Sequence, residues 1–321
     1  MKTIHAKLVA LLALPLSLLL AMSVAFAQDD FPSGEITLII PYGPGGMTDV
    51  SGRILAEFLE RELGQRVDVV NRPGAGGFVG LGEFLRTEPD GHTIIAVTTD
   101  IVANSVLLER DFDLDSLAFV GSYMPQERVL FANLNTPYET FEGFLEHAQQ
   151  DRVTFADGGA LWLANIMRAM AQEAGADISH VPFESGAEGS AALLGGHVDI
   201  GETGVGTPAW HAAKEGELRI LGVLTDGDLT PFGFDEVENL QDKGFTFVAR
   251  MYYGLALPAG VPEERRARLE AALQAALEDE DVVRRLEEID LTPRFLTGEE
   301  YTAVAAAVLE ESAELKAFLD E

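Results

Sequence analysis

The stretch PYGPGG, residues 41–46, places two prolines and three glycines between an apolar run, ITLII, and an amphipathic segment. Glycines leave backbone N–H groups uncovered, and the N-terminus of a helix carries a partial positive charge. The pattern therefore predicts an anion site, with the amides of Gly46, Met47 and Thr48 directed at the ligand. Asp49 would face an anion poorly, so we expect it to cap the helix by accepting an amide hydrogen bond.

Five further loops of similar character follow apolar runs: NRPGAGG (71–77), TTD (98–100), ADGGA (156–160), ESG (184–186) and GETGVG (201–206). In open α/β sheets, ligands bind beyond the carboxyl ends of the strands, where such loops lead into helices. A single glycine turn is ordinary, but several at one edge of a sheet predict a ligand cleft.

The runs that must position these loops alternate between strand and helix patterns. We expect strands at 36–40, 67–70, 92–97, 119–123, 129–132, 153–156, 180–183, 198–201 and 218–225. We expect helices at 48–63, 78–86, 138–150, 161–174, 187–194 and 208–215, and a mostly helical C-terminal part at 262–280, 281–288 and 298–319. This alternation predicts a parallel-rich α/β architecture. Because the chain is longer than one core usually organises, we expect two lobes.

Residues 1–27 contain Lys2 and Lys7, then an apolar run that ends in AFA before Gln28. This is typical of a secretory signal peptide cleaved after Ala27, and it predicts a soluble periplasmic or otherwise extracytoplasmic protein. An uncleaved membrane anchor is the alternative, since the run approaches the ~20 residues that a spanning helix needs. The chain has no cysteine, so it has no disulfide in a compartment that would permit one.

The chain is strongly acidic, with a formal net charge of −31 that becomes −33 when the two leader lysines are removed. Such a charge opposes binding to nucleic acid or to an anionic membrane surface. We therefore expect no nucleic acid as a partner. Separately from the charge, we expect a small-molecule ligand and a monomeric protein.

The motifs of common enzymes are absent. No lysine follows the glycines as in a phosphate-binding loop, no complete G-x-G-x-x-G occurs, and no G-x-S-x-G is present. Asp111, Asp113 and Asp115 begin like a calcium loop, but Ser116 and Ser122 stand where that loop requires glycine and glutamate. We expect no cofactor and no metal, and the pattern favours a binding protein over an enzyme.

Several long motifs carry a resemblance: PYGPGGMTDVSGR, LGQRVDVVNRPGAGG, PDGHTI, VPFESGAEGSAALLGGHVDIG and ELRILGVLT. In this order and spacing they resemble the Bug family, the extracytoplasmic solute receptors of tripartite tricarboxylate transporters. The resemblance implies a two-lobed, type II periplasmic-binding-protein fold of the Venus-flytrap kind that closes on a carboxylate. It also implies delivery to a permease with one large and one small integral membrane subunit.

The resemblance implies lobes at residues 29–125 plus 250–321 and at 126–249. It implies ligand contacts in the first lobe at Tyr42, Gly45, Gly46, Met47, Thr48, Asp49, Gly76, Gly77, Thr98 and Thr99. In the second lobe, the implied contacts are Gly158, Gly159, Ala160, Ser185, Gly186, Gly201 and Glu202.

Two residues depart from the family pattern. Trp162 follows a turn after which family members often have a histidine, and it is either helix core or a wall for an apolar ligand body. Glu202, if it points into the cleft, would repel a carboxylate or recruit an amine on the ligand. For Arg53, we favour an ion pair at the edge of the core over a ligand contact. Two other functions stay open at this point: an exported α/β enzyme acting on a carboxylate ester or amide, and a solute sensor for a signalling partner.

Overall fold

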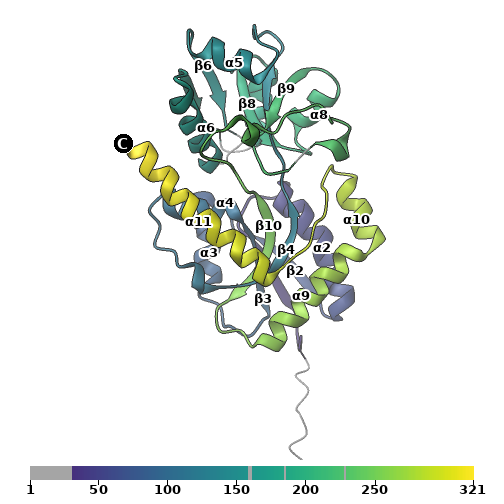
Figure 1. Cartoon of the computed structure of the whole chain (residues 1–321). Coiled ribbons are helices and arrows are strands. Elements are labelled where there is room, and N and C mark those ends of the chain that lie inside the picture. The colour runs from purple at the N-terminus through teal and green to yellow at the C-terminus, as the bar shows by residue number, and fades with distance from the viewer. Residues whose placement is uncertain (1–30, 158–160, 184–185, 228) are drawn as a thin grey trace, which may run out of the picture.

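The computed structural model describes residues 31–157, 161–183, 186–227 and 229–321 and contains two β-sheets (Figure 1). The first sheet has the strand order β11-β4-β10-β3-β1-β2. Its strands are β1 (Ile36–Ile40), β2 (Val67–Asn71), β3 (Thr93–Thr98), β4 (Leu117–Pro125), β10 (Tyr252–Pro258) and β11 (Leu296–Thr297). The second sheet has the order β7-β6-β8-β5-β9. Its strands are β5 (Arg128–Asn133), β6 (Val153–Ala156), β7 (Ile178–Val181), β8 (Ile200–Gly204) and β9 (Leu218–Val223).

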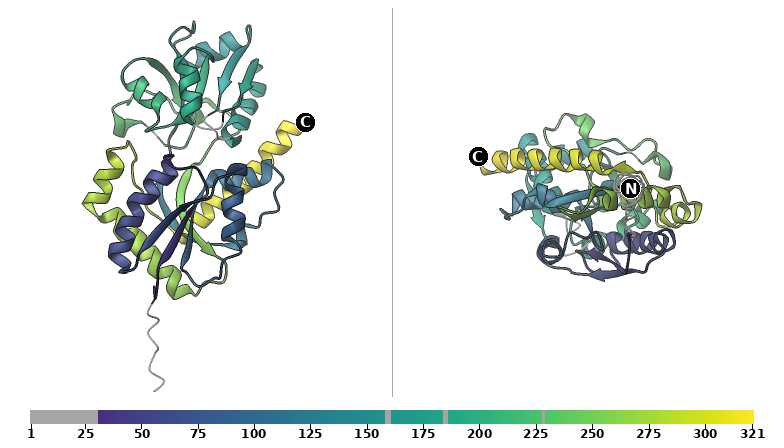
Figure 2. Two further views of the ribbon diagram at one scale, coloured as in Figure 1. Left: turned by 180° about the vertical axis from the view of Figure 1, so that it is seen from behind. Right: turned by 90° about the horizontal axis from the view of Figure 1, so that it is seen from below.

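Helices cover both faces of each sheet. The helices of the first lobe are α2 (Met47–Leu63), α3 (Phe78–Phe84), α4 (Thr99–Leu107), α9 (Glu263–Glu278), α10 (Glu280–Glu287) and α11 (Gly298–Asp320). Those of the second lobe are α5 (Phe141–Ala148), α6 (Leu161–Ala174), α7 (Gly186–Leu194) and α8 (Pro208–Lys214). Seen from below, α11 and α2 lie on opposite sides of the first sheet (Figure 2).

The strand β1 shows why both faces are covered. Its sequence ITLII is apolar at nearly every position, which is typical of a strand buried on both faces. Leu38 and Ile40 pack in the cluster that includes Leu55 and Leu59 of α2. Ile39 lies in the other cluster, with Ile101 of α4. At the far end of α2, Gly64 takes a left-handed conformation (φ 68°) and donates its N–H to Glu60 O, as expected for a C-terminal glycine.

Two chain segments connect the lobes side by side. One runs from the end of β4 to β5, the other enters β10, and Gln126 N donates to Met251 O across them (2.8 Å). The Thr99 hydroxyl of α4 donates to Arg250 O (2.7 Å), which fixes the second segment to the first lobe. The lobe boundaries near residues 125 and 250 stay a prediction. The end of β4 at Pro125 and the start of β10 at Tyr252 agree with it.

The expected parallel-rich architecture is only partly right, because both sheets are mixed. The strands β1, β2 and β3 are parallel, as are β6, β7 and β8, whereas β4, β5, β9, β10 and β11 make antiparallel pairs. The strands β5 and β10 follow the two crossings and so enter their sheets in the opposite direction. Helix α4 and strands β10 and β11 were not predicted, and β8 extends to Gly204 through residues that the sequence suggested were loop.

Candidate functional site

The glycine loop at residues 41–46 leads directly into α2, whose N-cap is Gly46. The Asp49 carboxylate reaches back and accepts the Gly45 N–H (2.9 Å), so Asp49 caps the start of the helix. Arg53 Nε and Asn71 Nδ2 also donate to it, at 3.0 and 2.9 Å. Burial raises the pKa of Asp49, but the hydrogen bonds from Arg53, Gly45 and Asn71 outweigh it, and the pKa lies below its ordinary value. Arg53 therefore forms the ion pair at the core edge, behind the loop.

The three amides that follow are the candidate anion donors. No hydrogen bond between described residues uses the N–H groups of Gly46, Met47 or Thr48. The Thr48 side chain is buried, and so is Tyr253, which lines the cavity described next. Burial raises the pKa of Tyr253 to about 12, so this phenol is neutral at physiological pH. The loop thus presents uncovered amides at a helix N-terminus, where a negative charge is stabilised.

Gly46 and Met47, but not Thr48, line a cavity of about 410 Å³ that we call the Arg128 chamber. Its walls come from both lobes and from the first crossing. It is lined by Pro44, Gly45, Gly46, Met47, Gln126, Arg128, Gly186, Ala187, Thr203, Gly206, Thr207, Pro208 and Tyr253. Gln126 Oε1 and Thr203 Oγ1 are buried and have no hydrogen-bond partner among the described residues. Unpaired polar atoms in such a place are those that a ligand or ordered water would satisfy.

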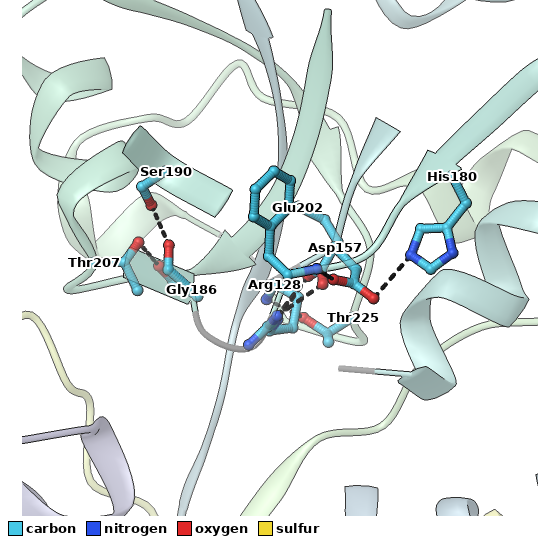
Figure 3. A network of polar contacts seen from close by, with 10 residues as sticks. Arg128, Asp157, His180, Gly186, Ser190, Glu202, Thr207 and Thr225 are labelled. Atoms are coloured by element: carbon cyan, nitrogen blue, oxygen red, sulfur yellow. Dashed lines mark hydrogen bonds and ion pairs between the residues drawn. The ribbon is translucent and has the colours of Figure 1, made fainter. Parts of the chain in front are cut away.

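A buried ion pair lies at this chamber (Figure 3). Arg128 Nε and Nη2 donate to the Glu202 carboxylate over 2.7–2.9 Å, and the two residues are 6% and 2% exposed. No hydrogen bond between described residues uses Arg128 Nη1, so this edge of the guanidinium is left for a ligand in the chamber. The expectation that Glu202 lies in a loop is wrong. It lies in strand β8, next to β5, and Arg128 neutralises it.

A second cavity, of about 610 Å³, is the Asp100 chamber. It is lined by Pro41, Tyr42, Gly43, Pro73, Gly74, Ala75, Gly76, Gly77, Asp100, Asn104, Leu108, Leu161 and Phe183. The two chambers are neighbours along the same loops. In the first lobe, Gly43 lines the Asp100 chamber and Pro44 the Arg128 chamber. In the second lobe, Phe183 lines the Asp100 chamber and Gly186 the Arg128 chamber.

The loops of the second lobe are fixed by polar contacts near α7 (Figure 3). Asp157, at the end of β6, accepts from Phe183 N (3.0 Å) and lies 2.9 Å from His180 Nε2. Ser190 of α7 donates to Gly186 O (2.6 Å) and accepts from Ala209 N of α8 (3.3 Å). These contacts hold the first turn of α7 at the Arg128 chamber.

The predicted site residues divide into three groups. Those that line a chamber are Tyr42, Gly45, Gly46, Met47, Gly76, Gly77 and Gly186. Those that are described but do not line these two chambers are Thr48, Asp49, Thr98, Thr99, Gly201 and Glu202. Gly158, Gly159, Ala160 and Ser185 lie outside the described residues. Thr98 still acts on the site, because its hydroxyl lies 2.7 Å from that of Tyr42.

Sequence reasoning missed six charged, amide and hydroxyl side chains of the chambers. These are Asp100, Asn104, Gln126, Arg128, Thr203 and Tyr253. One signal was available: Arg128 begins RVLFAN, a strand that is otherwise apolar until its last residue and is buried throughout. A charge at such a position requires a partner. The Trp162 side chain is 1% exposed and packs in a hydrophobic cluster. Of its two interpretations, helix core is therefore the right one.

Comparison with known proteins decides the family. A family model described as "Tripartite tricarboxylate transporter family receptor" matches residues 52–318. The chain belongs to this receptor family. Its members are non-enzymatic solute-binding receptors, so the alternative of an exported hydrolytic enzyme is wrong. No helix in the described part of the chain combines the length and apolar composition that crossing a membrane requires.

Relatives of this receptor share most of its length. A Bordetella pertussis protein of the UPF0065 group is 30% identical over 81% of this chain and 81% of its own. BugT of the same organism is 27% identical over 90% of this chain and 93% of its own. The structure of a periplasmic transporter matches with a TM-score of 0.78 and 26% identity, covering 89% of this chain and 97% of its own.

Two further structures hold ligands. MatC from Rhodopseudomonas palustris with bound malate has a TM-score of 0.76, 22% identity and coverage of 89% and 100%. A second R. palustris protein, with adipate, has a TM-score of 0.77, 22% identity and coverage of 89% and 98%. These likenesses show that the receptor has the type II periplasmic-binding-protein fold.

Proposed function

We propose that this receptor captures a small organic carboxylate between its lobes and hands it to a membrane permease. The observation that carries the proposal is the composition of the Arg128 chamber. Gly46 and Met47, whose amides at the start of α2 are uncovered, line the same chamber as Arg128. Amides at a helix terminus and a planar guanidinium both match the oxygens of a carboxylate. Malate and adipate in two structures of the same fold support this ligand class.

Closure of the lobes completes the site, because the chamber has walls from both. Gly206 of the second lobe lies against Met47 and Ile289 of the first, so closely that a Cβ at Gly206 would meet Ile289 O at 2.6 Å. Nearby, Trp210 Nε1 and Lys214 Nζ donate to the Asp290 carboxylate at 3.0 and 2.5 Å. These contacts join the lobes beside the chamber. A ligand that touches both walls favours this closed arrangement over an open one.

The remaining parts of the proposal rest on the family and the leader. The signal peptide is cleaved after Ala27, and the mature receptor works in the periplasm as a monomer. It delivers its ligand to the large and small integral membrane subunits of a tripartite tricarboxylate transporter. A gene pair for such subunits beside this one would support transport, and a neighbouring sensor kinase without them would support the signalling alternative.

The test is a thermal-shift screen of residues 28–321 against mono-, di- and tricarboxylates. A ligand that binds only the folded state stabilises it by about 2.7 kcal/mol at a hundredfold excess over Kd. We expect at least one carboxylate to raise Tm in a concentration-dependent way. Uncharged esters or amides that raise Tm equally, or a panel without effect, would contradict the proposal.

A pair of glycine variants tests closure within the same screen. Gly206 (φ 77°) and Gly216 (φ 79°) have similar left-handed conformations, but a Cβ at Gly216 has no atom within 4 Å. Both Ala variants carry the same backbone strain. We expect Gly206→Ala to reduce the ligand-induced shift, because it blocks the approach of the lobes, and Gly216→Ala to leave it unchanged. Equal effects would show that closure at Gly206 is unnecessary.

A further inference from the structure

Two side chains on the first turns of α4 make an unusual pair in the Asp100 chamber. Asn104 Nδ2 donates to Asp100 Oδ2 (3.0 Å), and both residues line the chamber. Asp100 is 8% exposed and Asn104 is 3% exposed. The second oxygen of each, Asp100 Oδ1 and Asn104 Oδ1, is buried and has no hydrogen-bond partner among the described residues.

Both unpaired atoms are acceptors. A carboxylate only accepts hydrogen bonds, so the amide must turn its nitrogen toward Asp100 and keep its oxygen for another partner. The pair therefore presents two unpaired acceptor oxygens, beside the second N–H of the Asn104 amide. Leaving a buried acceptor unpaired is unfavourable, and more so for a charged group. A ligand group that supplies two or more donors would remove this penalty.

The charges around Asp100 favour a cationic donor. Burial has the largest effect and raises the pKa of Asp100 to about 7, Arg128 of β5 lowers it, and Glu202 of β8 and Asp157 raise it. Arg128 is already paired with Glu202, and Asp157 with His180. The other titratable groups that interact with Asp100, the phenols of Tyr42 and Tyr253, carry no positive charge. The protein thus surrounds Asp100 with more negative than positive charge.

We propose that the ligand is an amino carboxylate, with its carboxylate in the Arg128 chamber and its ammonium group on Asp100 Oδ1 and Asn104 Oδ1. The inference rests on the proposed function and names the substrate class of that site. An ammonium group has three donors and one positive charge, which satisfies both acceptors and offsets the charge of Asp100. The chambers are lined by adjacent residues, Gly43 and Pro44, and the proposal requires that one small molecule reaches both.

The test is isothermal titration calorimetry with three matched ligand sets. These are propionate, lactate and alanine; succinate, malate and aspartate; and glutarate, 2-hydroxyglutarate and glutamate. Members of a set differ only in the hydrogen, hydroxyl or ammonium group at one carbon. In each set that binds, we expect the amino member to bind at least tenfold more tightly than the unsubstituted acid. The Asp100→Asn variant should reduce this preference to threefold or less.

A matched control and a pH series separate recognition from folding. Asp111 is exposed, and Asp111→Asn removes one negative charge without altering the chamber, so the preference for the amino ligand should stay at wild-type strength.

Between pH 6 and 8 the amino group of the ligand stays protonated, while Asp100, whose pKa is about 7, loses its proton. Affinity for the amino ligand should therefore rise about tenfold in the wild type and stay constant in Asp100→Asn.

The outcomes are distinguishable. If the unsubstituted acids bind as tightly as the amino acids, the inference is overturned and carboxylate binding stands. If affinity falls as pH rises, Asp100 binds as a neutral acid that donates to the ligand, which also overturns the inference. If no member of any set binds but another carboxylate of the thermal-shift screen does, the inference is overturned and the proposed function stands. If no carboxylate binds in either experiment, both fail.

Discussion

The two chambers share their loops but treat a buried acid in opposite ways. Beside the Arg128 chamber, Glu202 is held by the Arg128 guanidinium through three short hydrogen bonds, and no described residue bonds the Nη1 atom of that guanidinium. In the Asp100 chamber, Asp100 has one neutral amide as partner, and two acceptor oxygens stay without a partner among the described residues. The charge that each chamber presents to a ligand therefore depends on whether its buried acid is paired with a cationic side chain.

The same comparison distinguishes two physical costs. A buried ion pair does not destabilise the folded protein strongly as long as both charges are present. A buried carboxylate without a cation does destabilise it, until a cationic ligand binds or a proton neutralises the carboxylate. Removing the charge of Arg128 should therefore lower the free energy of unfolding, whereas removing the charge of Asp100 should raise it.

The largest effect is expected from breaking the Arg128–Glu202 pair. Arg128→Met leaves Glu202 buried without its cation, and we expect the free energy of unfolding to fall by about 3–5 kcal/mol in urea denaturation. The double variant Arg128→Met/Glu202→Leu should recover most of this loss, because no buried charge remains. It should still fail to bind a carboxylate. Recovery of binding along with stability would show that Arg128 does not contact the ligand.

Removing the charge of Asp100 should instead raise the free energy of unfolding. The pKa of Asp100 is raised from 3.8 to about 7, so this residue lowers stability progressively as pH rises from 3.8 through 7. Above pH 7 without ligand, we expect Asp100→Asn to be more stable than the wild type, by at most about 4 kcal/mol. At pH 4 the two should differ little. Urea denaturation at pH 4 and pH 8 measures this, and a variant that is less stable at pH 8 would contradict it.

A smaller effect is expected from covering the amides of the Arg128 chamber. Gly46 has an ordinary extended conformation, and the nearest atom to a Cβ there is Gly43 O at 3.7 Å, so Gly46→Val should fold normally. Its branched side chain crowds the amide surface, and we expect carboxylate binding to weaken tenfold or more, about 1.4 kcal/mol. Calorimetric titration with the best carboxylate from the screen checks this.

The smallest effects are expected beside and behind the loop. Thr48→Ala removes one hydroxyl and should weaken binding by about 0.5–1.5 kcal/mol, as a lost hydrogen bond does. Arg53→Ala should change affinity less than Gly46→Val, because Arg53 is occupied by Asp49 and Asn71. Loss of binding in Arg53→Ala together with normal binding in Gly46→Val would mean that a salt bridge holds the ligand instead of the amides.

Local signals explain what the sequence predicted well. The bounds of β1, β6 and α6 agree with those expected at 36–40, 153–156 and 161–174, since each is an apolar run with clear turn residues beside it. The Asp49 cap also follows from local chemistry, because it joins residues four apart in the chain.

Long-range pairing explains what the sequence could not give. Arg128 and Glu202 are 74 residues apart and meet because the first crossing inserts β5 antiparallel to β8. Without that pairing, Glu202 resembled a residue of a glycine loop and Arg128 a residue at the edge of a strand. Asp100 was assigned to a short polar loop, whereas it lies on the first turn of α4 with Asn104 one turn later.

We propose that a carboxylate closes the two lobes around the Arg128 chamber. Small-angle X-ray scattering of the mature receptor, with and without a saturating carboxylate identified by the screen, tests it most directly. We predict a smaller radius of gyration with the ligand, because closure brings the walls of the chamber together. Saturation in calorimetry with no change in the radius of gyration would contradict the claim and indicate a rigid site.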